Sequence, residues 1–262
     1  MSLPVEERGA ENPTTVVLVH GAGVAGWMWR SQVESLADFH CLVVDLPDHG
    51  ANRGTPFGTV DECAADVLRL VEARAHGGKA HLVGHSLGAK IVLAAVARGP
   101  ERIHGAVVAS ALVRPSWMAA MVGSHATNAL SLWMLRCEWV RRAQSKAFQF
   151  PDEEYREHFL DDLEHMTIDS LDRPGKAFAS SLRLPAELGK ARCPLCVLAG
   201  AREPLAMRES ARDIAAAVPG ASGFLLENAR HNFPWTHAAL FNAVLRACLT
   251  GAELPREGLR AI

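Results

Sequence analysis

Short apolar runs alternate with longer amphipathic stretches along most of this chain. Several of the runs are almost continuous Val, Leu and Ala, which is typical of strands buried on both faces of a parallel sheet. The alternation predicts an α/β architecture, with a mostly parallel sheet of about six strands and helices on both faces. The expected strands are Thr15–Val19, His40–Val44, Ala80–Val83, His104–Ala109, Leu195–Ala199 and Gly223–Leu226.

Four helices can be placed from their start and stop signals. The clearest start is Thr59-Val60-Asp61-Glu62, a Thr-x-x-Glu capping box that opens a helix extending to about Arg74. Glycine or proline follows the end of each of the other three, as is common after a helix. They are expected at Leu87–Arg98, Met207–Val218 and His237–Leu249.

The segment from Leu112 to Leu184 interrupts this rhythm, since it has helical patterns but no buried strand. We interpret it as a helical insertion, with the core formed by residues 1–111 and 185–262. Its Trp117, Met121 and Trp133 are candidates for lining an apolar substrate pocket, although such residues also pack an insertion against a core. The end of the chain, from Glu253 onward, is expected to be a loose tail.

Composition narrows the class of protein. Hydrophobic residues make up 49% of the 262 residues, and 27 basic residues nearly balance 29 acidic ones. Nothing in this balance favours nucleic acid or an anionic membrane as a partner. The N-terminus does not have the form of a signal peptide, and no apolar run is long enough to span a bilayer, so we expect a cytoplasmic protein. Cys193 and Cys196 open an expected strand and are interpreted as core residues, because no second pair of metal ligands lies nearby.

The run Gly84-His85-Ser86-Leu87-Gly88 is the strongest chemical signal. It fits Gly-x-Ser-x-Gly between an expected strand and an expected helix, the context in which a sharp turn exposes a nucleophilic serine. The flanking glycines remove side chains that would collide at such a turn. The sequence therefore predicts that Ser86 is a nucleophile.

A serine hydroxyl needs a histidine base and a carboxylate that orients it. His231 follows the last expected strand, where functional groups of parallel sheets gather, whereas His237 lies inside the final helix. Glu203 is the first carboxylate after the strand Leu195–Ala199. The predicted triad is Ser86, Glu203 and His231. The alternative acids are Asp172 and Glu227.

An acyl-transfer site also needs two donors for the oxyanion. The N–H of Leu87, at the start of a helix, is one candidate. The other is the N–H of Ala22 in the loop His20-Gly21-Ala22-Gly23, which follows the first expected strand. A phosphate-binding loop is the rival interpretation of these glycines, but the Lys-Ser/Thr ending of a P-loop is absent.

Together these residues resemble the α/β-hydrolase superfamily. The resemblance rests on His20-Gly21, on Asp45-Leu46-Pro47-Asp48-His49-Gly50, on the Ser86 motif, and on Glu203 and His231, and it extends from about residue 14 to about residue 250. It implies that residues 112–184 are a cap over the active site. Two departures are a glutamate where members usually have aspartate, and an N-terminal hairpin that is absent or much reduced.

The resemblance implies an esterase-like enzyme. The short N-terminus is similar to that of the plant methylesterase and hydroxynitrile lyase branch and of many small bacterial esterases. The lyases depend on a lysine just after the histidine, and this sequence has Asn232-Phe233-Pro234 there. We therefore expect cleavage of a small, hydrophobic carboxylic ester without metal or cofactor. A ligand receptor of this fold and a cofactor-free perhydrolase or haloperoxidase remain alternatives.

Overall fold

A computed structural model describes residues 3–262, except for the side chain of Met118. Its centre is a sheet with the strand order β1-β3-β2-β4-β5-β6-β7-β8. Neighbours from β3 to β7 are parallel, and the two edge strands are antiparallel. The strands are β1 (Val5–Arg8), β2 (Thr15–Val19), β3 (His40–Val44), β4 (Ala80–His85), β5 (Ile103–Ala109), β6 (Leu195–Gly200), β7 (Ser222–Leu226) and β8 (Leu259–Ala261).

All six predicted strands are present, and the structure adds the two edge strands. The expectation of a loose C-terminal tail is wrong at its end, because β8 pairs with β7. Both added strands are short, and the sequence of β1, Val5-Glu6-Glu7-Arg8, has one apolar residue. Edge strands of this kind are not buried on both faces, so their sequences lack the continuous apolar run by which the central strands are recognised.

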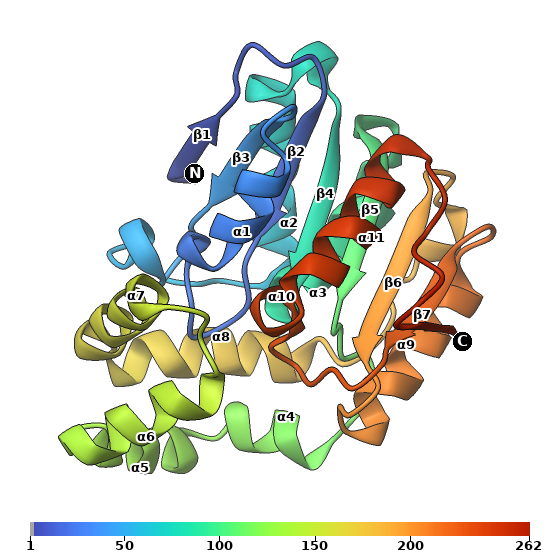
Figure 1. Ribbon diagram of the computed structural model, residues 1–262. Coiled ribbons are helices and arrows are strands. Elements are labelled where there is room, and N and C mark those ends of the chain that lie inside the picture. Colours follow the sequence, from blue (N-terminus) through green and yellow to red (C-terminus); the bar gives the residue numbers. More distant parts are fainter. Residues whose placement is uncertain (1–2) are drawn as a thin grey trace.

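The sheet has a separate apolar core on each face. Along β2, Val17 and Val19 belong to the core that holds α2 and α3, whereas Val16 and Leu18 belong to the core that holds Phe241 of α11. Successive strand residues point to opposite faces, which explains why the run is apolar at every position. Figure 1 shows α11 crossing one face of the sheet, with α2 and α3 on the other.

The helices begin and end close to the predicted residues. Thr59 caps α2, and its side chain and that of Glu62 form the reciprocal hydrogen bonds of a capping box. The predicted final helix, His237–Leu249, corresponds to α11, and a short α10 that was not predicted precedes it. The helices are α1 (Arg30–Ser35), α2 (Val60–Arg74), α3 (Leu87–Arg98), α4 (Trp117–Val122), α5 (His125–Met134), α6 (Glu138–Phe148), α7 (Glu153–His165), α8 (Ile168–Ser180), α9 (Leu205–Ala217), α10 (Phe233–Thr236) and α11 (Ala238–Thr250).

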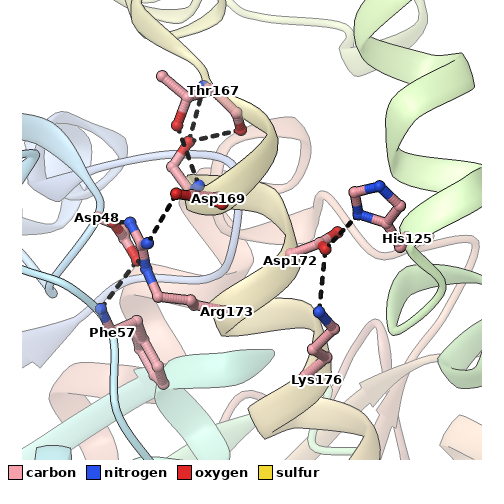
Figure 2. A network of polar contacts seen from close by, with 9 residues as sticks. Asp48, Phe57, His125, Thr167, Asp169, Asp172, Arg173 and Lys176 are labelled. Atoms are coloured by element: carbon pink, nitrogen blue, oxygen red, sulfur yellow. Dashed lines mark hydrogen bonds and ion pairs between the residues drawn. The ribbon is translucent and has the colours of Figure 1, made fainter.

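Five helices, α4 to α8, lie between β5 and β6. We call residues 112–184 the cap segment. It lies across the end of the sheet at which the parallel strands terminate (Figure 1). An ion pair ties it to the core, since Arg173 of α8 donates to both carboxylate oxygens of the buried Asp48, at 2.6 and 2.9 Å (Figure 2).

Lys90 of α3 holds both ends of the cap segment. Its ammonium donates to the carbonyl of Leu112 at 2.7 Å and to that of Ser181 at 2.6 Å. The side chain is buried, and this burial lowers the pKa of Lys90 to about 7. A single core residue therefore fixes the points where the chain enters and leaves the cap segment.

Candidate active site

Ser86 is the single residue between β4 and α3, and its backbone is strained. Its φ of 54° and ψ of −112° lie outside the regions that side-chain-bearing residues usually adopt. The turn fits only because glycines flank it. A Cβ on Gly84 would lie 2.5 Å from the carbonyl oxygen of Gly88, and one on Gly88 would lie 2.1 Å from that of Val19. The predicted strand–serine–helix turn is thus present, with Ser86 partly exposed.

The structure brings Glu203 and His231 together. Nδ1 of His231 lies 2.6 Å from Oε1 of Glu203. Because a carboxylate only accepts, Nδ1 carries the proton and donates it in this hydrogen bond. This leaves Nε2 as the basic nitrogen. The His231 side chain is 42% exposed, whereas that of Glu203 is 1% exposed.

Glu203 is held from two further sides. Its Oε2 accepts from Ser110 Oγ at 2.9 Å and from the N–H of Gly200 at 2.7 Å. Ser110 follows β5 and Gly200 ends β6, so the ends of two neighbouring strands position the carboxylate. Sequence reasoning missed Ser110. Its positive φ of 56° is a backbone feature with no sequence signal.

The two alternative acids lie elsewhere. Asp172 is on α8, where its carboxylate accepts from His125 and Lys176 (Figure 2). It also accepts from the side-chain amide of Asn128. The hydrogen bonds from Asn128 and His125 hold the pKa of Asp172 well below its usual range. Glu227 is exposed on the loop after β7. Neither has a hydrogen bond with His231 among residues 3–262.

His85 positions the His231 loop. Its Nε2 donates to the carbonyl oxygen of His231 at 2.9 Å, and the two rings are 4.7 Å apart between centroids. Burial, followed by the nearby charge of His231, holds the pKa of His85 well below its usual range, so the ring is neutral. No hydrogen bond in the described residues joins Ser86 Oγ to His231 Nε2, a contact that often forms only when substrate binds.

Two buried histidines shape the loop that contains Ala22. His20 donates from Nδ1 to the carbonyl of Gly21 at 2.7 Å and accepts the N–H of Leu46 at 3.0 Å. His49 accepts the N–H of Gly23 at 3.3 Å. Burial lowers the pKa of His20 to about 4, so this ring is also neutral.

The loop also reaches the nucleophile. A Cβ on Gly21 would lie 3.3 Å from the Cβ of Ser86, so the chain just before Ala22 passes close to it. Among the described residues, no hydrogen bond occupies the N–H of Ala22 or of Leu87. Both predicted oxyanion donors are therefore available.

The sequence of this chain was compared with protein-family models and with curated proteins. The model of the Alpha/beta hydrolase family matches residues 16–244, which is most of the chain. The chain belongs to this family. A pimeloyl-[acyl-carrier protein] methyl ester esterase of Nitrosomonas europaea is 29% identical over 131 residues, 48% of this chain and 49% of that protein. This α/β hydrolase spans less than half the length of the curated relatives it matches.

Solved structures share the fold. A thermophilic esterase from Thermogutta terrifontis superposes with a TM-score of 0.74 at 22% identity, covering 95% of this chain and 93% of that chain. An enol-lactonase from Burkholderia xenovorans gives 0.72 at 23% identity, covering 95% and 96%. Identity at this level establishes the architecture of this α/β hydrolase and leaves its chemistry to the site.

A pocket of about 370 Å³ lies between the cap segment and the core of this α/β hydrolase. Ala22 and Val24 form part of its core side, and the remaining wall comes largely from α5 to α8. Leu135, Phe148 and Phe159 give it an apolar part. Ser131, Gln144, Thr167, Ser170 and Arg173 give it a polar part.

The three cap residues predicted to bind substrate do not line this pocket. Trp117, Met121 and Trp133 are 70%, 46% and 62% exposed. The prediction that they form the pocket wall is therefore corrected. The cap helices α4 and α5 present their smaller and polar side chains inward, Ala119 and Asn128 among them, and leave these large apolar groups outside.

Within residues 3–262, no group of three His, Cys, Asp or Glu side chains is arranged to hold a metal ion. None of the helices that the structure describes is both long and apolar enough to cross a bilayer.

Proposed function

We propose that this chain is a serine hydrolase that cleaves a small carboxylic ester through an acyl-enzyme on Ser86. The observation that carries the proposal is the 2.6 Å hydrogen bond between His231 and the buried Glu203, at the sheet end where Ser86 occupies its strained turn. Together these supply a nucleophile, a base and a buried charge that orients the base. The esterase among the curated relatives supports the same chemistry.

The reaction has two steps. His231 Nε2 takes the proton of Ser86 Oγ as the oxygen attacks the ester carbonyl, and the tetrahedral oxyanion is bound by the N–H groups of Ala22 and Leu87. The resulting imidazolium is stabilised by Glu203 and returns its proton to the departing alcohol. Water, deprotonated by His231, then attacks the acyl-enzyme and releases the acid and free Ser86.

The pocket is lined by Ala22 but not by Ser86 or His231, so it bears on the part of an ester that extends from the reacting carbonyl toward the cap segment. Its apolar part would receive a short acyl or alkyl chain, and its polar part, around Ser131 and Gln144, would accept a polar substituent. A volume of about 370 Å³ is at the lower end for small-molecule sites. We therefore expect rates to rise from acetyl to butyryl esters and to fall for long chains.

The test uses p-nitrophenyl esters of increasing chain length with the wild type and Ser86→Ala. We expect hydrolysis by the wild type and its loss in the variant, and equal rates would refute the proposal. A fluorophosphonate probe with mass mapping should label Ser86, and the label should be absent in His231→Ala. Tight retention of a ligand with little or no release of product would instead favour a receptor.

A further inference from the structure

The outer side of the cap segment carries an unusual concentration of exposed apolar side chains. Of the eight large hydrophobic residues exposed in the part of the chain that the structure describes, seven lie between residues 117 and 139. Val122 lines the pocket, whereas the other six, three of them tryptophans, do not. Trp117, Trp133 and Trp139 are 70%, 62% and 73% exposed. Such a cluster is rare on a protein without a partner for it.

These side chains belong to one layer of the molecule. Helices α4, α5 and α6 lie beyond α8 as seen from the sheet, so they form the outermost layer of the cap segment (Figure 1). Within α5, Leu130, Trp133 and Met134 have the i, i+3, i+4 spacing of a single helix face. We call the exposed side of α4 to α6 the outer cap face.

The outer cap face is also positively charged. Residues 117–148 contain four basic side chains, Arg136, Arg141, Arg142 and Lys146, and one acidic side chain, Glu138. On α6, Trp139, Arg142 and Lys146 follow one another at i, i+3 and i+7, which places aromatic and basic groups on the same side. The whole chain has 27 basic and 29 acidic residues, so its near-neutral balance conceals this local excess.

Aromatic rings beside basic side chains are the pattern by which proteins bind the surface of an anionic bilayer. Tryptophan is enriched at the level of the lipid headgroups, and each nearby Lys or Arg adds electrostatic attraction. A second copy of the chain fits less well, because a symmetric contact would bring two positive faces together. We propose that the outer cap face docks on anionic phospholipid surfaces.

Docking there would affect the site through existing contacts. The carbonyl of Phe148, the last residue of α6, accepts hydrogen bonds from Asn232 at 3.2 Å and from the indole of Trp235 at 2.9 Å. Both donors lie just after His231. A lipid surface that holds α6 would thus also hold the loop carrying this histidine, independently of whether the proposed hydrolysis takes place.

The test is flotation of the full chain with vesicles of phosphatidylcholine alone or mixed with phosphatidylglycerol. Ser86→Ala serves as the parent, so that no lipid hydrolysis intervenes and failure of the proposed function cannot affect the result. We expect binding to the mixed vesicles, little binding to phosphatidylcholine alone, and weakening by salt.

Variants of the parent locate the contact. The double substitution Trp133→Ser with Trp139→Ser should lower the partition coefficient about a hundredfold, roughly tenfold for each ring. Arg142→Gln with Lys146→Gln should lower it about twenty-fivefold, roughly fivefold for each charge. The matched control is Leu205→Ser on α9, the eighth exposed residue, at 61% exposure, which should leave binding unchanged.

Three outcomes would overturn the proposal. They are no flotation of the parent with the anionic vesicles, equal loss in the Leu205 control, or a dimer in sedimentation velocity that the tryptophan substitutions dissociate. Circular dichroism establishes that each variant is folded. If the double variant does not fold, Trp139→Ser alone should still weaken flotation about tenfold.

Discussion

Replacing Glu203 with glutamine would test the part of the proposed triad that departs from the usual aspartate. The N–H of Gly200 points at the side chain, 2.7 Å away, and requires an acceptor there. The amide oxygen of a glutamine would satisfy it, which turns the NH₂ group toward Nδ1 of His231. That arrangement favours the tautomer with its proton on Nε2, the nitrogen that must accept the proton of Ser86.

The expected loss follows from the charge as well as the tautomer. With Nδ1 and Oε1 2.6 Å apart, the centres of charge in the imidazolium–carboxylate pair are about 4 Å apart. At an effective dielectric constant of about 20, their attraction is about 4 kcal/mol, or roughly a thousandfold in rate. The wrong tautomer adds to this, so we expect kcat to fall about 10³- to 10⁴-fold.

The assay is kcat and KM for p-nitrophenyl butyrate, since the change acts on the reacting groups and should leave KM nearly unchanged. Glu203→Asp keeps the charge but shortens the reach by one methylene, so its kcat should be intermediate. Glu227→Gln is the matched control on an exposed loop and should behave as the wild type. A Glu203→Gln enzyme within about tenfold of the wild-type kcat would refute the assignment of the acid.

Three further predictions concern the turn and the cap segment. Gly88→Ala places a Cβ 2.1 Å from the Val19 carbonyl oxygen and should cost about 3 kcal/mol or more; an unchanged midpoint of thermal unfolding would contradict this. Burial lowers the pKa of Lys90 from 10.5 to about 7, so the unfolded chain binds more protons between these pH values and the free energy of unfolding should rise with pH there. This rise, up to about 5 kcal/mol, should be missing in Lys90→Met. If the free energy of unfolding, measured with urea, changed with pH in the same way for both proteins, the prediction would be wrong. Arg173→Gln leaves the carboxylate of Asp48 buried without its ion pair and should lower the free energy of unfolding in urea by about 2 kcal/mol. Adding Asp48→Asn should partly relieve this loss, and strictly additive losses would exclude a coupling between the two side chains.

The sequence by itself determined the features that depend on neighbouring residues. The buried strands were recognisable because their apolar runs serve a core on each face, as Val16 and Val17 do. The strand–serine–helix turn at Ser86 was recognisable because its glycines are a local steric requirement. The capping box at Thr59 is equally local, since both of its hydrogen bonds close within one helical turn.

Only the tertiary structure decided which distant groups meet. Glu203, Asp172 and Glu227 are alike as carboxylates, and the register of β5 beside β6 is what places Ser110 and Gly200 around the first of them. The packing of the cap segment likewise decided that Trp133 faces outward, because periodicity shows that a helix has an apolar face without showing what covers it. Contacts between segments far apart in the chain depend on the summed packing of the whole fold, and no short stretch of sequence records them.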